Sequence, residues 1–172
     1  MTDLPQLGGA SGTPDASPSD AAPGAPRPRL TLVTLGGWAM ASADQEGAPT
    51  PVFGPSKPLA LLAYLACAPG RTARRDHLAD LLWADLEQTA AHHAFRQTLW
   101  YIRQRIGTDG LASDAGQVSL TADVDVDRDA FDAAVTRRDD ERAVALYTGD
   151  FLPGFAAPGG AEFEQWADLE RG

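Results

Sequence analysis

Cysteine is almost missing from this chain of 172 residues, since Cys67 is the only one. An intrachain disulfide is therefore excluded, as is usual for proteins of a reducing cytoplasm. Long apolar runs are missing too: the longest, from Leu59 to Ala68, is far shorter than the roughly 20 residues of a membrane-spanning helix. The N-terminus lacks a basic stretch followed by an apolar one, so we expect no signal peptide, no membrane contact and a cytoplasmic protein.

Positive charge is scarce, with 14 Lys and Arg residues against 24 Asp and Glu residues and a net charge of -10. Taken alone, this deficit argues against a nucleic-acid partner, because binding a phosphate backbone requires cations. The charge is unevenly distributed, however. Residues 56–106 carry a net charge of +3, whereas residues 107–172 carry -10. A basic segment beside an acidic one indicates two modules with different roles.

Signatures of metal and catalytic sites are missing as well. His77, His92 and His93 lack metal-ligand spacing, because adjacent histidines on a helix point about 100° apart and no Cys or carboxylate joins them. The aspartates of the 123–129 segment lack the central glycine and closing glutamate of a calcium loop. The glycine pair at 36–37 lacks the context of a phosphate loop, and no nucleophile–base pair stands out. We expect neither an enzyme nor a bound metal or cofactor.

The first part of the chain has two distinct compositions. Residues 1–28 are rich in Ala, Gly, Pro, Ser and Asp, which predicts a disordered leader. Strand-forming residues follow: a run over 30–35 stops at Gly36-Gly37, residues 38–40 resume it, and residues 52–53 form another short run. The ordered part should therefore begin with a small antiparallel sheet.

Three helices and a hairpin are predicted next. Ser56 is a suitable N-cap for a first helix that ends at Pro69-Gly70, and a second helix covers 75–83. The third and longest helix runs over 88–106 and ends at Gly107. Its apolar residues recur every three or four positions, which makes one buried stripe: Ala91, Phe95, Leu99, Ile102 and Ile106. The short β-like runs 110–113 and 117–120 then predict a hairpin around the turn Asp114-Ala115-Gly116.

Helical periodicity returns after Thr121, over Asp127–Arg137, Asp139–Tyr147 and 162–170. The residues expected to be buried there are Phe131, Ala134, Val135, Ala143, Val144, Leu146, Phe163, Trp166 and Leu169. Two short antiparallel helices followed by a third resemble the opening of a tetratricopeptide-like array, which needs about three repeats to be stable. The sequence is therefore expected to stop within a truncated helical domain.

A small sheet, three helices and a hairpin occur in the order of a winged helix-turn-helix, an α+β fold whose third helix enters the major groove of DNA. A helical wheel of residues 88–106 places four residues outermost: His93, Gln97, Trp100 and Gln104. The same wheel puts Arg96 and Arg103 on one flank, and Tyr101 and Arg105 on the other. Glutamine can pair with adenine and arginine with guanine or phosphate.

The outer face of this helix contains no Asp or Glu between Thr89 and Ile106, although the chain is strongly acidic. A helix with Arg and Gln on its outer face is more often simply solvated. The large aromatic residue Trp100, next to Tyr101, and the hairpin over 110–120 favour DNA binding instead. The sequence therefore predicts double-stranded DNA as partner, with 88–106 as recognition helix and 110–120 as wing.

Seven stretches of the chain, between residues 30 and 171, together resemble the Streptomyces antibiotic regulatory protein (SARP) family of actinobacterial transcriptional activators. They read LTLVTLGGW (30–38), KPLALLAYLACAPGR (57–71), DHLADLLWADL (76–86), FRQTLWYIRQRIG (95–107), VSLTADVDVDRDAF (118–131), ALYTGDFLPGF (145–155) and EFEQWADLER (162–171).

The resemblance implies an OmpR-like winged-helix domain over 29–121, joined to the first helices of a bacterial transcriptional activator domain over 122–172. It also implies binding to direct repeats at promoters, usually as a homodimer, and recruitment of RNA polymerase. Five residues then fall on the recognition helix: Arg96, Gln97, Trp100, Arg103 and Gln104. Lys57, at the start of the first helix, would be either a phosphate contact or a solvated end residue.

The chain departs from the family pattern at the start of the second helix, where Arg74 stands in place of the usual Ser or Thr. This arginine is either a phosphate contact or part of a frayed helix end. Glu87-Gln88 replaces Asp-Pro at the opening of the recognition helix, and Ala94 replaces a frequent Asn. Besides a promoter-binding activator, the acidic excess leaves open a protein-interaction module, in which the helices of 123–172 dock a partner and DNA binding is weak or lost.

Overall fold

The computed structural model describes residues 29–43, 50–114, 116–156 and 160–171, which form six α-helices and two small sheets. The predicted leader, 1–28, lies outside the described residues. The strands are β1 (Arg29–Val33), β2 (Ala39–Ala43), β3 (Thr50–Phe53), β4 (Thr72–Arg74), β5 (Leu111–Asp114), β6 (Gln117–Leu120) and β7 (Val124–Val126). The α-helices are α1 (Lys57–Cys67), α2 (Arg75–Trp83), α3 (Gln88–Ile106), α4 (Asp127–Arg137), α5 (Asp140–Leu146) and α6 (Ala161–Arg171).

The first sheet has the strand order β3-β2-β1-β7. Leu30 and Leu32 of β1 point into the core while Arg29 and Thr31 point outward, as alternation in a half-buried strand requires. The strands β1, β2 and β3 pair antiparallel as predicted, but β7 pairs with β1 in parallel. The predicted antiparallel strands are therefore confirmed, whereas the parallel strand β7 was not predicted. Three residues are too short to produce a periodic signal, and the long crossover between parallel strands hides their pairing.

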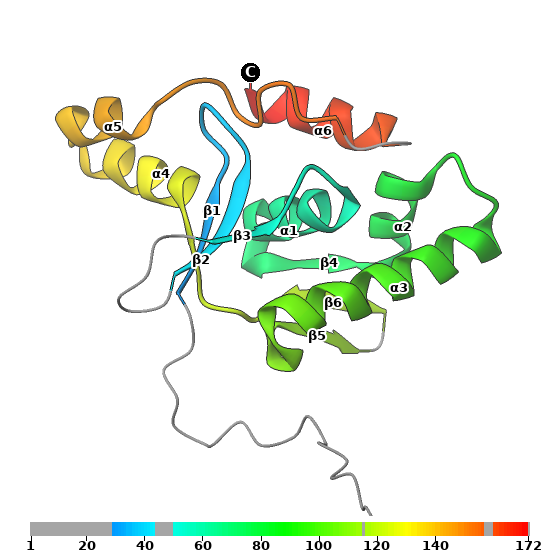
Figure 1. Cartoon of the computed structure of the whole chain (residues 1–172). Helices are drawn as coiled ribbons and strands as arrows, with labels where there is room; N and C mark the ends of the chain where they lie inside the picture. Colours follow the sequence, from blue (N-terminus) through cyan, green and yellow to red (C-terminus); the bar gives the residue numbers. More distant parts are fainter. Residues whose placement is uncertain (1–28, 44–49, 115, 157–159, 172) are drawn as a thin grey trace, which may run out of the picture.

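Helix α1 lies at the centre of the molecule, between the two sheets (Figure 1). Most of its residues from Leu59 to Ala66 are fully buried, as expected for a helix that is apolar all round. Ser56 occupies the N-cap position, but its hydroxyl does not cap the helix. The Ser56 Oγ instead donates a hydrogen bond to the Gly54 carbonyl at 2.9 Å, so the predicted side-chain cap is absent.

Helices α2 and α3 have the predicted bounds, and the predicted apolar stripe of α3 from Ala91 to Ile102 is buried. The hairpin β5–β6 also forms where it was expected, although β5 begins at Leu111 rather than residue 110. A second strand was missed besides β7. The short strand β4 pairs with β6, with Thr72 opposite Ser119, and this makes a second sheet of order β4-β6-β5.

Helices α4 and α5 pack against each other at one end of the molecule, whereas α6 packs along α2 (Figure 1). Phe163 of α6 is fully buried, as predicted. The predicted burial of three other apolar side chains was wrong, because Val135 is 51% exposed, Val144 77% and Leu169 81%. No described element packs over these side chains. No helix in the described ranges has the length and apolarity needed to cross a membrane.

A loop after β1 connects the first sheet to the first residue of α4 and to the chain that follows α5. Asp127 accepts hydrogen bonds from the backbone N–H groups of Thr34 and Leu35, each at 2.9 Å, and the Thr148 hydroxyl donates to the Leu35 carbonyl at 2.6 Å. Gly36 has a φ of +69°, and a Cβ at this position would lie 2.6 Å from the Thr148 hydroxyl. Only glycine fits such a close approach.

Arg128 of α4 makes a second connection, because it forms an ion pair with Glu170 of α6 and lies 5.2 Å from the centre of the Phe151 ring. It also faces Cys67 at the end of α1. Burial raises the pKa of the Cys67 thiol to about 11, against the opposing effect of the Arg128 charge. The C-terminal helices are therefore attached to the same core as α1 and α2, which includes Phe163 and Ala167.

Candidate nucleic-acid interface

The outer face of α3 is the surface that the sequence predicts for DNA. Phe95, Leu99 and Ile102 point into the core, so the opposite side of this 19-residue helix faces solvent. All four residues predicted to be outermost are exposed: His93, Gln97, Trp100 and Gln104. Trp100 is 63% exposed, which is unusual for the largest apolar side chain. The helix thus presents a planar apolar group between hydrogen-bonding groups.

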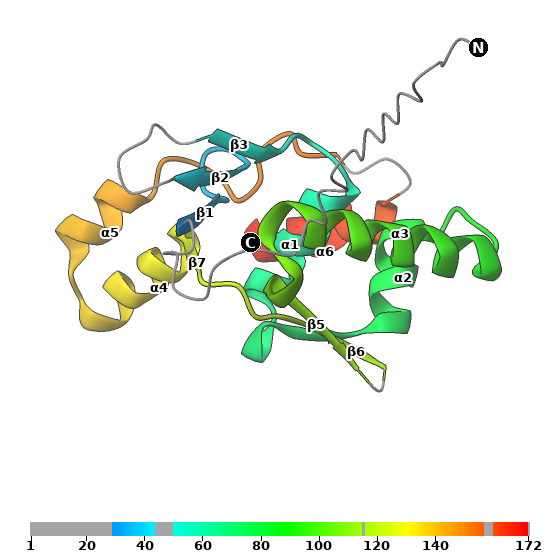
Figure 2. The same cartoon turned by 60° about the horizontal axis from the view of Figure 1, so that its bottom comes forward.

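One flank of α3 lies against the hairpin β5–β6. Arg103 is partly buried, and its Nε donates a hydrogen bond to the Leu111 carbonyl of β5 at 3.1 Å. Arg96, two turns earlier on the same flank, is exposed. Figure 2 shows the hairpin projecting beside α3 on one side of the molecule. The predicted recognition helix and the predicted wing are therefore neighbours, and Arg103 joins them.

The other flank of α3 turns toward the first sheet. The Tyr101 ring packs edge-on against Phe53 of β3, with 5.8 Å between ring centres. The guanidinium of Arg105 lies 5.2 Å from the centre of the Tyr101 ring. The structure therefore separates Tyr101 from the hairpin side of α3, although the sequence predicts it to be a DNA-binding residue.

Lys57 also lies apart from this face. Its Nζ is 3.8 Å from an Asp85 carboxylate oxygen and 5.0 Å from the centre of the Trp83 ring, so the side chain covers the C-terminal end of α2. Only 19% of the side chain is exposed. Burial lowers the pKa of Lys57, and the Asp85 charge opposes that shift. The cation thus has an acidic partner within the chain, and Lys57 is not a fully solvated end residue.

Arg74 stands at the N-terminus of α2, on the strand that borders the hairpin. Its backbone is extended, with φ -72° and ψ 139°, and its side chain makes no capping hydrogen bond. The residue is exposed and lies opposite Gln117 of β6. The structure thus places Arg74 beside the hairpin, which also borders the Arg96 flank of α3.

Arg75 contacts the hairpin although the sequence did not predict a role for it. Its Nη1 donates a hydrogen bond to the Ser113 hydroxyl of β5 at 2.7 Å, and its guanidinium lies 5.5 Å from the centre of the Phe95 ring. Two adjacent arginines therefore point to different surroundings, Arg74 to solvent and Arg75 to the hairpin. The pair Arg74-Arg75 was the only sequence signal, and it does not tell which arginine turns inward.

The electrostatics of this surface follow from what lies near its cations. Helix α3 contains no Asp or Glu. Within the part of the chain that the structure describes, neither Arg74 nor Arg96 forms an ion pair. Asp114, at the end of β5, is an exposed acidic residue on the hairpin. Cations without acidic partners remain available to an anionic ligand such as a phosphate group.

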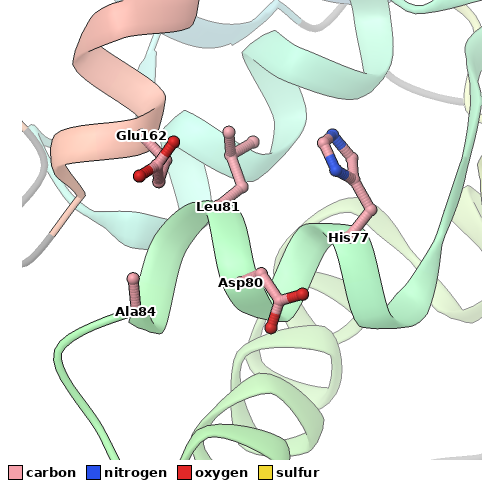
Figure 3. Close-up of a pocket in the computed structure, with 5 residues that line it drawn as sticks. All are labelled: His77, Asp80, Leu81, Ala84 and Glu162. Atoms are coloured by element: carbon pink, nitrogen blue, oxygen red, sulfur yellow. The ribbon is translucent and has the colours of Figure 1, made fainter.

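A pocket of about 360 Å³ lies between α2 and α6. It is lined by His77, Asp80, Leu81, Ala84 and Glu162 (Figure 3). The His77 ring nitrogen is 2.8 Å from the Tyr64 hydroxyl, so this histidine is part of the packing between α1 and α2. Among the described residues, no group of three His, Cys, Asp or Glu side chains could hold a metal ion. None of the predicted DNA-binding residues lines this pocket.

Comparisons with known proteins identify a similar fold. No family model matches the chain, and no curated protein matches it significantly in sequence. A solved structure of Mycobacterium tuberculosis EmbR, in complex with a low affinity phosphopeptide, is similar with a TM-score of 0.58 and 20% sequence identity. The match covers 83% of this chain but 42% of the EmbR chain. The chain therefore shares the fold of the part of EmbR that it matches.

Proposed function

We propose that this chain is a sequence-specific DNA-binding transcriptional regulator of the SARP type. The observation that carries the proposal is the outer face of α3, which lacks acidic residues, exposes Trp100 and borders a hairpin. The likeness to EmbR, a SARP-family regulator, supports the same conclusion at the level of the fold. It also favours a regulator over an enzyme.

In this proposal, residues 29–121 act as an OmpR-like winged helix. Helix α3 enters the major groove, where Gln97 and Gln104 can pair with adenine and Trp100 can contact the methyl group of thymine. His93 is placed to reach a base edge from the same face. Arg96 and Arg74 bind phosphates, which fixes the orientation of the helix without reading sequence. Arg103 holds the hairpin through its Nε and has its terminal nitrogens left for a phosphate.

Residues 122–172 are proposed to be the first helices of a tetratricopeptide-like activator domain. By the family resemblance, the whole regulator binds direct repeats at promoters as a homodimer, recruits RNA polymerase and acts in the cytoplasm of an actinobacterium. The chain spans 42% of the EmbR structure, so the phosphopeptide binding in that structure is not carried over to it.

A matched pair of arginines on α3 tests the assignment of the interface. A duplex selected from a random DNA library by the full chain serves as ligand, and fluorescence anisotropy measures its dissociation constant. Arg96→Ala should weaken binding by about tenfold or more, the usual cost of losing a hydrogen bond to a charged group such as a phosphate. Arg105→Ala should change it by less than about twofold, because Arg105 lies over Tyr101 on the opposite flank.

Equal losses in both variants would mean that binding depends on total charge rather than on this face of α3. No loss in either variant would contradict the proposed interface. Thermal unfolding of the two variants controls for stability, which should match that of the wild type because both side chains are exposed.

A second candidate function is a protein-interaction module with weak or lost DNA binding. The exposed apolar side chains of the C-terminal helices favour it, since Val144 is 77% exposed and Leu169 81%. The same library selection decides between the two functions. Enrichment of a DNA sequence that binds with a steep salt dependence would exclude the second as the main function.

A further inference from the structure

The hairpin β5–β6 is attached to the rest of the molecule at its turn by Arg75. The backbone N–H of Arg75 donates a hydrogen bond to the Gly116 carbonyl at 2.8 Å, while the Arg75 side chain donates to the Ser113 hydroxyl at 2.7 Å. Gly116 belongs to the turn and Ser113 to strand β5. One residue at the first position of α2 therefore holds the hairpin at two points.

The same side chain also touches the recognition helix. The Arg75 guanidinium lies 5.5 Å from the centre of the Phe95 ring, and Phe95 is fully buried in the core stripe of α3. Cation–π contacts of this kind stabilise more strongly when they are partly desolvated, as they are here. Arg75 thus links three elements: it belongs to α2, its terminal nitrogen contacts β5 and its guanidinium group lies near Phe95 of α3.

A planar guanidinium suits this position. It can lie over an aromatic ring while an N–H at its edge donates to a hydroxyl, whereas a lysine ammonium has no plane to stack. Arg75 forms no ion pair with the acidic residues in the described ranges. Its contacts are therefore with the hairpin and with α3.

We propose that Arg75 is a positioning residue that holds the hairpin at a fixed angle to α3 and thereby sets the DNA affinity of the interface. The inference rests on the proposed function and deepens it. Helix α3 and the hairpin touch different parts of a DNA duplex, so both sets of contacts contribute fully only when the two elements are already in position. If the hairpin is mobile, the protein binds DNA more weakly, because ordering the hairpin on binding costs free energy.

Hydrogen–deuterium exchange of the full chain without DNA tests the mechanical part. Arg75→Ala and Ser113→Ala should each speed amide exchange over residues 111–120, because both remove the bond between Arg75 and β5. Arg74→Ala is the matched control. Its side chain faces solvent one position earlier, so exchange in the hairpin should stay at the wild-type rate. Unchanged exchange in the Arg75 and Ser113 variants would overturn the proposal.

Titrations of the library-selected duplex at several salt concentrations test the functional part. Arg75→Ala and Ser113→Ala should each weaken binding by about three- to tenfold, as expected for one hydrogen bond. The double variant should bind DNA about as tightly as the single variant with the lower affinity, because both changes remove the same interaction. Arg75→Lys should recover part of the loss, since lysine can still donate to Ser113.

The salt dependence separates a positioning residue from a phosphate contact. In the Arg75 and Ser113 variants the slope of log K against log salt concentration should stay at the wild-type value. In Arg74→Ala it should fall by about one, as for a lost phosphate contact. A slope reduced by about one in Arg75→Ala, together with unaffected Ser113→Ala, would overturn the proposal in favour of direct contact.

Failure of the proposed function would be visible separately. If the wild-type chain enriched no duplex, DNA binding would be refuted together with any role of Arg75 in affinity. The exchange measurement would still decide whether Arg75 holds the hairpin. Ser113→Ala removes one hydroxyl group, so this variant keeps the test valid even if Arg75→Ala impairs folding.

Discussion

Asp114 is the residue whose charge fits the proposed interface least. It is exposed at the end of β5, opposite Gln117, on the hairpin that we propose to lie against the DNA backbone. A carboxylate near phosphates is repelled, and the repulsion weakens as salt screens it. The hairpin contacts α3 through the Leu111 backbone carbonyl. We expect its acidic residue Asp114 to lower the affinity of the protein for DNA.

Replacing this charge gives the first prediction. Asp114→Asn should strengthen DNA binding by about two- to fivefold at low salt, with a smaller gain at high salt, since the energy of one screened surface charge is about 1 kcal/mol or less. Anisotropy titrations at two salt concentrations measure it. Asp140→Asn on α5, at the far end of the molecule (Figure 1), is the control and should have little effect. Equal gains in both variants would indicate only a response to net charge.

The sequence predicts the exposure of single residues on α3 but not the residues that they contact. The exposure of Gln97, Trp100 and Gln104 followed directly from the apolar period of α3, and the structure confirms it. The partners of Arg103 and Tyr101 could not be predicted. Arg103 donates to the Leu111 carbonyl of the neighbouring strand β5, whereas Tyr101 packs against Phe53 of β3, which is distant in sequence. A helical wheel gives the direction of a side chain but not the element that it meets.

At the scale of elements, the N-terminus of α2 combines two competing roles. Arg74 occupies the N-cap position, where a Ser or Thr hydroxyl would accept a hydrogen bond from an unpaired backbone N–H group. An arginine has no acceptor to offer. The chain therefore has a cation beside the hairpin in place of a capped helix.

Replacing Arg74 by serine should change the stability of the fold and its affinity for DNA in opposite directions. Arg74→Ser should raise the free energy of unfolding by about 0.5–1 kcal/mol, because it supplies the missing cap. It should also weaken DNA binding and lower the slope of log K against log salt concentration by about one. Urea denaturation and salt titrations measure the two effects. Arg74→Ala, which supplies no cap, should show only the binding defect, and a stability gain in both variants would contradict the capping argument.

The long helices and the hairpin were predictable, whereas two three-residue strands were not. Helix α3 has 19 residues and shows its period several times over, so its bounds came out correctly. Strands β4 and β7 have three residues each, and both are defined by distant partners, Ser119 for Thr72 and Leu30 for Val124. The order of the three helices and the hairpin was therefore foreseen, while the neighbours of each sheet edge were not.

At the scale of the whole molecule, one core joins elements that lie at its two ends. Helices α4 and α5 lie at the opposite end from α3 and the hairpin, in both views (Figures 1 and 2). The core is nevertheless continuous: Trp166 of α6 packs 4.9 Å from Tyr64 of α1, and Arg171 donates to the Phe151 and Leu152 carbonyls.

This shared core implies that the proposed DNA-binding part depends on α6 for stability. A chain ending at residue 160 loses the buried Phe163 and Ala167 and uncovers Tyr64 and one side of α2. Its free energy of unfolding should fall by at least about 3 kcal/mol, the usual cost of removing one buried aromatic side chain. Urea denaturation followed by circular dichroism measures the change. The full chain should unfold in a single transition, and Leu169→Ser, at a position that is 81% exposed, should leave the midpoint unchanged. An unaltered midpoint in the shortened chain would instead mean that residues 29–121 fold independently of the helices behind them.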